Sequence, residues 1–230
     1  MFSNKRQLGD IYYGISKKNK KSKKDTDSDK SSSESNDDND ILANLTKKGN
    51  DDKITRDNNH IYFHSEVDRE SIFQLTSLIN EAEEENVFTS FKLNIDPIPI
   101  YLHINSYGGS IYAAFAAIDV IESCKVPIYT IIEGATASAG TLISVFGKKR
   151  FIRPRAHMLI HQLSSSCWGK MHEIEDEYKN LTELMEKITK IYREKTSIPK
   201  KELTELLKHD LWLDADKSIK YGLVDEKWNN

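Results

Sequence analysis

The sequence has little cysteine, no long apolar run and almost no net charge. Its 230 residues include 2 cysteines, Cys124 and Cys167, which form no recognisable motif. A disulfide framework is therefore not expected, and a reducing compartment is the simpler assignment. No apolar stretch approaches the roughly 18 residues of a membrane span. The formal net charge of −3 gives no field that would favour nucleic acid or a membrane surface as a partner.

The N-terminal region contains no apolar segment of the kind found in secretory signals, so we expect a cytoplasmic protein. A basic block at Lys17–Lys24 precedes an acidic, Ser- and Asn-rich block at Asp25–Asp40. Lysine blocks can direct a protein to the nucleus or bind nucleic acid, but a solvated tail is the simpler interpretation. Such a segment cannot offset the entropy cost of ordering. We expect a disordered tail over residues 1–57 and one folded domain over residues 58–230.

Short apolar strands alternate with helical patterns along the folded part. We expect strands at 61–63, 100–104, 126–132 and 156–160, and helices at 66–85, at 110–124 and directly after residue 138. The strands are rich in β-branched and aromatic residues, whereas the helices repeat apolar residues every three or four positions. This alternation predicts an α/β fold of βαβ units, with a mostly parallel sheet that helices cover on both faces.

The C-terminal third is expected to be helical. Apolar residues recur every three or four positions from Met171 to Tyr192, opposite a densely charged face, over about seven turns. A helix this long and two-faced either covers the domain or projects to meet a copy of itself. Two shorter helices follow at 199–209 and 214–222, where proline opens the first and glycine ends the second.

The most informative segment is Gly134-Ala-Thr-Ala-Ser138-Ala-Gly140. Ser138 stands at a strand-to-helix turn among residues too small to shield it. A helix N-terminus offers unpaired N–H groups and the positive end of a dipole, which suits a serine that attacks a carbonyl. The alternative is a small-residue turn packed against a core. The segment is not the G-x-S-x-G elbow of α/β-hydrolases, because Thr136 stands two residues before the serine.

A serine nucleophile needs a base, and usually an acid to orient that base. His161 is the best candidate base, because it follows an apolar strand. His157 lies four residues earlier and is the rival. The two histidines could also form a metal pair, although no further ligands lie at helpful spacing. A hydrogen-bonded structural histidine is the other interpretation of His161.

Spacing alone does not identify the acid. Five aspartates lie downstream of the candidate base: Asp176, Asp210, Asp214, Asp216 and Asp225. Asp210 stands out modestly, because it precedes Leu211-Trp-Leu213, an apolar anchor that would pull it inward. The alternative is an ordinary surface carboxylate. Gly108 and Gly109 would let the backbone approach a ligand and point N–H groups at it, unless they form only a tight turn.

These candidates fall at the ends of successive strands. Asn105–Gly109, Ser138 and His161 each follow an apolar strand. In parallel sheets the chemistry gathers beyond the carboxyl ends of the strands. The sequence therefore predicts that these three segments meet at one edge of the sheet.

Five sequence blocks together resemble the ClpP family, the proteolytic subunits of the Clp protease. They are Ile104–Ser110 (I-N-S-Y-G-G-S), Ala137–Gly140 (A-S-A-G), Met158–Gln162 (M-L-I-H-Q), Asp210–Ala215 (D-L-W-L-D-A) and Tyr221–Asp225 (Y-G-L-V-D). They stand in the family's order, and the resemblance covers residues 58–228. It implies the ClpP/crotonase-like α/β fold of repeated ββα-type units, in which residues 171–195 form a projecting handle helix.

The resemblance also implies roles for individual residues. Ser138 would be the nucleophile, His161 the general base and Asp210 the orienting acid of a serine protease. The backbone N–H groups of Gly109 and Ala139 would form the oxyanion hole. The order Ser, His, Asp differs from that of chymotrypsin-like and subtilisin-like enzymes, as convergence on one geometry permits.

The implied partners are those of a chambered protease. Gly108 and Gly109 would bind the substrate, an unfolded polypeptide. The chain would form homo-oligomeric heptameric rings, stacked in pairs, which an AAA+ ATPase unfoldase normally feeds. Neither a metal ion nor an organic cofactor would be needed for the chemistry, and no nucleic acid or membrane would be involved.

Some positions depart from the family's pattern. Tyr107 stands where the family's glycine block usually has proline. Leu163 stands where the family's usual H-Q-P-x-x-G block has proline. The N-terminal segment does not resemble the family's axial loops. Three alternatives therefore stay open: a catalytically silent structural ring subunit, a crotonase-fold enzyme acting on an acyl-CoA thioester, and a specialised protease, for example in virion maturation, that acts without an ATPase.

Overall fold

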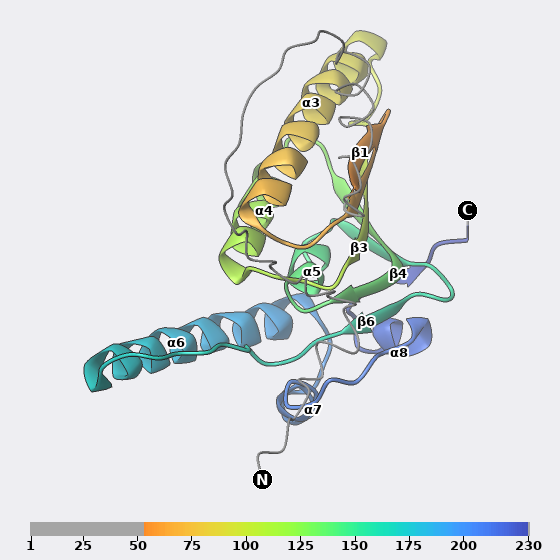
Figure 1. Ribbon diagram of the computed structural model, residues 1–230. Coiled ribbons are helices and arrows are strands. Elements are labelled where there is room, and N and C mark those ends of the chain that lie inside the picture. The colour runs from red at the N-terminus through yellow and green to blue at the C-terminus, as the bar shows by residue number, and fades with distance from the viewer. Residues whose placement is uncertain (1–52, 230) are drawn as a thin grey trace, which may run out of the picture. The chain divides into compact units, whose positions relative to one another are not determined.

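Figure 1 shows the computed structural model of the chain, which describes residues 53–229. The chain divides into two units, Met1–Asn50 and Asp51–Asn230, and the described residues belong to the second. The basic and acidic blocks of the expected tail lie outside the described residues. The division into a tail and a domain at residue 58 stays a prediction, and the described sheet begins at Lys53.

The described residues form one mostly parallel sheet. Its strands are β1 (Lys53–Asp57), β2 (His60–His64), β3 (Ile100–Ser106), β4 (Ile128–Ala137), β5 (Lys149–Ile152), β6 (His157–Leu159) and β7 (Glu226–Lys227). Their order is β1-β2-β3-β4-β5-β7, and β6 pairs with the C-terminal end of β4. Among the named strands of this part of the chain, only β1 and β2 pair antiparallel. The expected α/β fold is confirmed.

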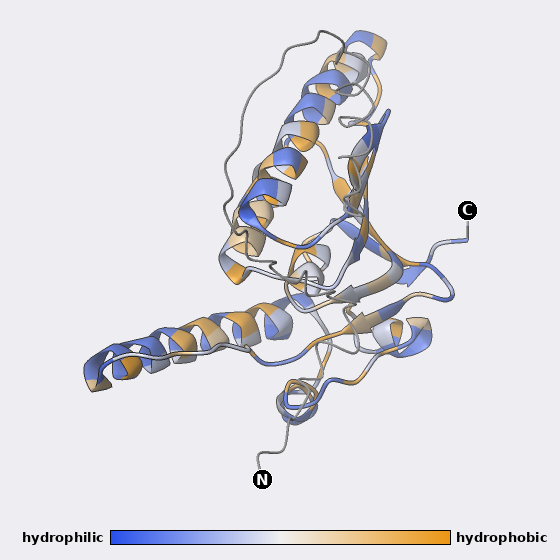
Figure 2. Cartoon of the chain, viewed as in Figure 1, coloured by the Kyte–Doolittle hydropathy of each residue, from blue (hydrophilic) through white to orange (hydrophobic). Residues whose placement is uncertain are grey.

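Helices connect and cover these strands. They are α3 (Arg69–Leu93), α4 (Ile111–Ser123), α5 (Ala139–Ser144), α6 (Met171–Lys195), α7 (Lys200–Leu206) and α8 (Ala215–Lys220). Helices α3 and α4 lie along one face of the sheet, whereas α6 projects from the domain as a long arm (Figure 1). Apolar and hydrophilic residues alternate along α6 (Figure 2), in keeping with the expected two-faced helix.

Helix α3 begins after Asp68, three residues later than expected, and also ends later than expected. The Asp68 carboxylate accepts from the Ser71 N–H, and the Ser71 hydroxyl accepts from the Asp68 N–H, a capping box. The apolar pattern predicts an end near residue 85, which is wrong. The last turns instead bury Asn86 and Ser90, whose side chains bind the backbone of Ile98. Hydrophobic periodicity does not detect packing of this polar kind.

The two faces of the sheet differ. On β2, Ile61 and Phe63 alternate into the core and are buried, as the period of a strand requires. The opposite face carries rings that contact one another, Tyr62 on His103, Tyr101 on Tyr129 and Tyr129 on Phe151. The three tyrosines remain partly exposed, so the expectation that helices cover both faces is wrong for these strands within residues 53–229. Tyrosine counts as apolar in a sequence pattern, but its ring can lie half exposed.

The sequence pattern does not predict β1, β5 and β7. These strands are short and carry charged residues, and β5 reads Lys-Arg-Phe-Ile. Strand β1 forms a hairpin with the adjacent β2, whereas β5 and β7 form by pairing with strands farther away in the chain. The Asp225 carboxylate accepts from both the backbone N–H and the guanidinium of Arg150, which holds β5 beside the chain that leads into β7.

Candidate active site

Three parallel strands end side by side at the candidate site. Strand β4 lies between β3 and β6, since Ser106 of β3 pairs with Thr136 and Thr136 pairs with Met158 of β6. The segments that follow these strands therefore emerge at one edge, as parallel strands require. The glycine loop, residues 107–110, and the turns after β4 and β6 lie at this edge.

Ser138 holds an unusual backbone conformation between β4 and α5. Its φ is 53° and its ψ is −124°, a region that residues other than glycine rarely occupy and that persists only when the surroundings fix it. The Ser138 N–H donates to the Leu159 carbonyl at 2.9 Å, and the Ser138 carbonyl accepts from the Thr141 N–H at 3.0 Å. The other non-glycine residues of positive φ in the described range are Asn58 and Asn94, and asparagine tolerates that conformation.

Gly108 leaves the space that Ser138 occupies. A Cβ atom on Gly108 would lie 2.7 Å from Ser138 Cβ and 2.9 Å from the Ala137 carbonyl oxygen. Its φ of +99° is a second reason for glycine at this position. The Gly108 N–H donates to the Ser106 hydroxyl at 3.2 Å, and its carbonyl accepts from the Val67 N–H at 2.8 Å. These bonds fix Gly108 to Ser106 and Val67, in its place beside the serine.

His161 and Asp210 form a hydrogen-bonded pair. Asp210 Oδ1 lies 3.0 Å from His161 Nδ1. The strand register explains the pairing, because Met158 and Leu213 exchange two backbone hydrogen bonds in an antiparallel bridge. His161 lies three residues after Met158, and Asp210 lies three residues before Leu213. Since this contact occupies Nδ1, the imidazole can offer Nε2 to a nucleophile.

Asp210 is more exposed than its sequence context predicts. Its side chain is 51 % exposed. The expected apolar anchor is divided, because Leu213 is buried whereas Leu211 is 60 % exposed. Only the C-terminal end of the segment, at Leu213, is therefore held in the core. Trp212 also contributes, since its ring contacts that of Tyr107 edge-on with the centres 6.3 Å apart, which joins the aspartate segment to the glycine loop.

A small cavity of about 150 Å³ lies beside the two candidate catalytic side chains, and both Ser138 and His161 line it. The apolar residues of its wall are Ile111, Leu142, Leu163 and Ile188. Within residues 53–229 no hydrogen bond joins the Ser138 hydroxyl to His161. Contacts of this kind are often long without substrate and tighten when it binds.

Two backbone N–H groups at the site are available to a ligand. Gly109 lines the cavity, and Ala139 is the first residue of α5, where an N–H has no partner inside the helix. Neither N–H donates a hydrogen bond to any part of the chain that the structure describes. Donors on two segments that meet at one edge of a sheet can stabilise an oxyanion.

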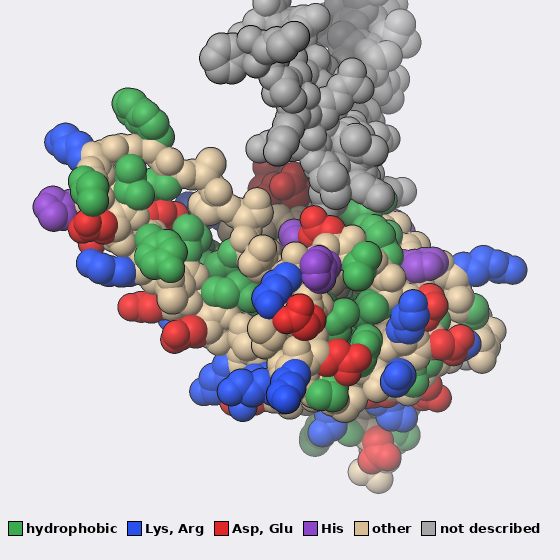
Figure 3. All heavy atoms as spheres, turned by 90° about the horizontal axis from the view of Figure 1, so that it is seen from below, with side chains coloured by type: hydrophobic (Ala, Val, Ile, Leu, Met, Phe, Trp, Pro, Cys, Tyr) green, Lys and Arg blue, Asp and Glu red, His purple; other side chains and the backbone are tan. Residues whose placement is uncertain are grey.

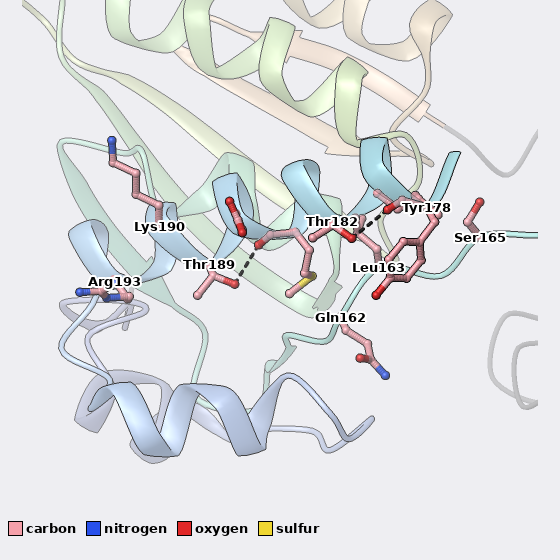
Figure 4. Close-up of a pocket in the computed structure, with 11 residues that line it drawn as sticks. Gln162, Leu163, Ser165, Tyr178, Thr182, Thr189, Lys190 and Arg193 are labelled. Carbon is pink, nitrogen blue, oxygen red and sulfur yellow. Dashed lines mark hydrogen bonds between the residues drawn. The ribbon is translucent and has the colours of Figure 1, made fainter. Parts of the chain in front are cut away.

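A larger groove of about 700 Å³ lies between α6 and the segment after His161 (Figure 4). Tyr178, Thr182 and Lys190 line it from the helix. Gln162 and Leu163 line it from the other side and also line the small cavity. The groove therefore adjoins the candidate site and offers space for more of a substrate than one side chain.

His157, the rival base, does not line the small cavity. Its side chain is exposed, and Nδ1 lies 3.1 Å from the Arg155 carbonyl oxygen. No group of three or more His, Cys, Asp or Glu residues in the range 53–229 could hold a metal ion. The same range contains no helix long and apolar enough to cross a membrane.

The sequence pattern does not predict the contact between two buried hydroxyl groups beneath the serine. The Thr141 hydroxyl donates to the Ser138 carbonyl at 2.7 Å and lies 2.7 Å from the Tyr192 hydroxyl. In the sequence, Thr141 stands at the start of an apolar run and Tyr192 on the apolar face of a long helix. A hydroxyl on each of two apolar faces is the signal that could have suggested their contact, because buried hydroxyls need partners.

A separate polar cluster lies on the partly exposed face of the sheet. His103 Nδ1 lies 2.9 Å from Glu133 Oε1, and Arg153 Nε donates to the same oxygen at 3.2 Å. The hydrogen bond with His103 is the main reason that the pKa of Glu133 is lowered to about 2. Burial, and then the charge of His103, lower the pKa of His60. None of these residues lines the small cavity.

The described part of the chain is thus an α/β protein with a serine, a histidine and an aspartate gathered at the carboxyl edge of a parallel sheet. The chain belongs to the Clp protease family, since the family model described as Clp protease matches residues 55–229. Both the resemblance to the ClpP family and the fold that it implies are confirmed.

Curated proteins agree with this assignment. The chain is similar to "ATP-dependent Clp protease proteolytic subunit 2" of Treponema denticola, with 40 % identity over 130 residues, which are 56 % of this chain and 65 % of that protein. The protein of the same name in Treponema pallidum is 35 % identical over 55 % of this chain and 64 % of its own length. "ATP-dependent Clp protease proteolytic subunit" of Streptococcus mutans is 35 % identical over 57 % of this chain and 69 % of its own length. The match thus spans less than two thirds of the first two relatives.

Proposed function

We propose that this chain is a serine endopeptidase that hydrolyses peptide bonds of unfolded proteins through Ser138, His161 and Asp210. The observation that carries the proposal is the 3.0 Å contact between His161 Nδ1 and Asp210 Oδ1, beside the cavity that Ser138 lines. A serine, a base and an acid that orients the base are the parts of nucleophilic acyl transfer.

Each group has a defined role in the reaction. His161 Nε2 takes the proton of the Ser138 hydroxyl as the serine oxygen attacks the peptide carbonyl carbon. Asp210 holds the imidazole in the required tautomer and stabilises its charged form. The N–H groups of Gly109 and Ala139 bind the oxyanion. His161 then protonates the leaving amine, and water hydrolyses the acyl-enzyme by the same route.

The small cavity suggests which peptides fit. Its wall combines four apolar residues with polar ones such as Ser138, His161 and Gln162, and its volume is about 150 Å³, so it suits one small or medium side chain next to the cleaved bond. Gly108 and Gly109 have no side chains, so their backbone can come close to the substrate. The adjoining groove along α6 can accept further residues of an extended chain.

We also propose an assembly for this chain. The curated relatives are named as proteolytic subunits of an ATP-dependent protease. We infer homo-oligomeric heptameric rings, stacked in pairs and fed by an AAA+ ATPase unfoldase, with the ClpP-like serine protease domain separate from an N-terminal tail. The exposed apolar side chains of α6 support a contact there: Met171, Ile174 and Tyr178 are 73 %, 45 % and 72 % exposed. Apolar side chains are visible along this arm in Figure 3.

One observation favours a second candidate, a catalytically silent ring subunit. The Ser138 hydroxyl makes no hydrogen bond with His161 in residues 53–229. The acyl-CoA alternative gives the His161–Asp210 pair no role and is not favoured. A protease without an ATPase differs from the proposed function only in its partner, and casein hydrolysis with and without a cognate ATPase separates the two.

The test is labelling of the assembled full chain with a fluorophosphonate, followed by peptide mass spectrometry. The proposal requires a label on Ser138 that is absent in Ser138→Ala and strongly slowed in His161→Ala. The matched control is His157→Ala, which should label at the wild-type rate. Folded, oligomeric protein that takes no label would favour the silent subunit.

A further inference from the structure

A chain of two hydroxyl groups joins α6 to the backbone of the candidate nucleophile. The Tyr192 hydroxyl lies 2.7 Å from the Thr141 hydroxyl, and the Thr141 hydroxyl donates to the Ser138 carbonyl at 2.7 Å. Tyr192 belongs to α6 and Thr141 to α5. The two residues come from separate helices and meet at the peptide unit that follows the serine.

The direction of both hydrogen bonds is fixed. The Ser138 carbonyl oxygen carries no proton, so the single hydroxyl proton of Thr141 must be given to it. The Thr141 oxygen can then only accept from Tyr192, and the phenol must donate. Burial raises the pKa of Tyr192 above its ordinary value. The phenol therefore keeps the proton that it donates throughout the pH range in which a histidine base works.

These hydroxyls belong to side chains that are shielded from bulk water, and Tyr192 also lines the small cavity beside Ser138. Tyr192 is 1 % exposed and Thr141 is fully buried. Hydrogen bonds that water cannot replace are expensive to break, because the group left behind stays buried without a partner. The two bonds therefore restrict the Ser138 carbonyl more firmly than surface contacts could.

The Ser138 backbone requires such restriction. Its φ of 53° and ψ of −124° are strained for a residue other than glycine, and such a conformation persists only when the surroundings over-determine it. The carbonyl also accepts from the N–H groups of Thr141 and Leu142, the second at 3.4 Å. Rotation of this carbonyl away from α5 would turn the Cα–Cβ bond of Ser138 and move its hydroxyl relative to His161 and the oxyanion donors.

We propose that Tyr192 and Thr141 are positioning residues that hold the strained backbone of Ser138 and so keep its hydroxyl aligned for attack. Neither residue takes part in bond making. The proposal rests on the proposed role of Ser138 as nucleophile and adds two residues on which the rate depends. The simpler alternative is that each hydroxyl only satisfies the other's hydrogen-bonding need.

The test compares labelling kinetics of the full, assembled chain in four variants. Tyr192→Phe removes only the phenol oxygen, Thr141→Val removes the hydroxyl at nearly constant shape, Thr141→Ser retains it, and the double variant Thr141→Val/Tyr192→Phe removes both. The maximal fluorophosphonate labelling rate and the half-saturating concentration are measured separately, and thermal unfolding is recorded for every variant.

We expect Thr141→Val to lower the maximal labelling rate by about 3- to 10-fold, the loss of one typical hydrogen bond. Tyr192→Phe should give a smaller decrease in the same parameter, while Thr141→Ser stays near wild type. The half-saturating concentration should not change. Because both residues act through one carbonyl, the double variant should label at the rate of Thr141→Val alone.

The outcomes separate this proposal from the proposed function. If the wild-type chain takes no label on Ser138, the proposed function fails. If wild type is labelled, and folded Thr141→Val and Tyr192→Phe label within twofold of it, the positioning role is wrong and the hydroxyls are only structural. Additive losses in the double variant would also overturn it. If Tyr192→Phe does not fold, the comparison of the labelling rates of Thr141→Val and Thr141→Ser still decides whether the hydroxyl has a positioning role.

Discussion

At the scale of single residues, the candidate site depends on one close approach. Gly108 and Ser138 lie so near that a Cβ on the glycine would stand 2.7 Å from Ser138 Cβ. Atoms at that distance must move apart, and the three nearest atoms belong to the serine and its adjoining backbone. Ser138 can therefore keep its position only if residue 108 is glycine.

Gly108→Ala should abolish fluorophosphonate labelling of Ser138 and lower the free energy of unfolding by about 1–3 kcal/mol, because of the clash and the positive φ. Labelling and chemical denaturation measure the two effects. The control is Gly134→Ala, where φ is +59° but the three atoms nearest to the Cβ would belong to the Asn105 side chain, at 3.1 Å or more. It should cost stability and keep the label. Normal labelling of Gly108→Ala would show that the serine does not need this packing.

Asp210→Asn tests the orienting acid. The variant keeps the shape of the side chain but loses the charge that holds the imidazole tautomer, so peptide hydrolysis should fall by about 10²- to 10⁴-fold. The half-exposed position of Asp210 favours the lower end of this range, since water screens the interaction. Asp216→Asn, which removes an exposed carboxylate paired with Lys227, is the control. Wild-type hydrolysis by Asp210→Asn would remove Asp210 from the site.

At the scale of secondary-structure elements, β2, β3 and β4 share a polar network on their partly exposed face. Glu133 of β4 binds His103 of β3 and Arg153, and His103 lies 2.9 Å from a ring nitrogen of His60 on β2. The network ties three neighbouring strands together on the face opposite α3 and α4. Its protonation should therefore affect the stability of the sheet.

The pH dependence follows from the lowered pKa of Glu133, about 2 against an ordinary 4.5. Between these values the unfolded chain binds a proton at this carboxyl that the folded chain does not, so stability is lost as the pH falls through this window. Glu133→Gln should have a lower Tm than wild type at pH 7 and a shallower decrease below pH 4.5. The lowered pKa of His60 acts in the same direction below pH 6.5.

Circular dichroism melts from pH 7 to pH 2 measure this effect. Glu84→Gln, a change of an exposed carboxylate on α3, controls for the loss of one negative charge. Parallel curves for wild type and Glu133→Gln would mean that the network does not contribute to acid stability.

At the scale of the whole molecule, the arm formed by α6 is the part that the domain does not bury. Its C-terminal half packs through Leu184, Ile188 and Tyr192, whereas Met171 and Tyr178 near its start are exposed. Apolar side chains on a projecting helix favour a contact with another molecule. The proposed pairing of two rings would cover them.

Ile174→Asp combined with Tyr178→Asp should therefore separate paired rings into single rings, which native mass spectrometry of the full chain would show as half the assembly mass. The physical reason is that two charges would have to be buried in an apolar contact. Lys187→Asp, on an exposed position of the same helix, is the control and should leave the mass unchanged. An unchanged mass for the double variant would place the ring contact elsewhere.

The sequence predicted most of what depends on local pattern. The apolar strands before Asn105, Ser138 and His161 could be identified, and the rule for parallel strands placed their ends together. It did not predict the end of α3 at Leu93, because Asn86 and Ser90 pack through hydrogen bonds. It also did not predict β5 and β7, whose pairing depends on contacts such as that of Arg150 with Asp225.

The sequence by itself determined the α/β class, the positions of the candidate nucleophile and base, and the family, since apolar periodicity and short blocks are local properties of the chain. The tertiary structure decided the contact of His161 with Asp210, through the antiparallel bridge of Met158 and Leu213. It also decided the strained turn at Ser138 and the meeting of Thr141 with Tyr192. These features join residues far apart in the chain, and only the packed sheet and helices fix their distances.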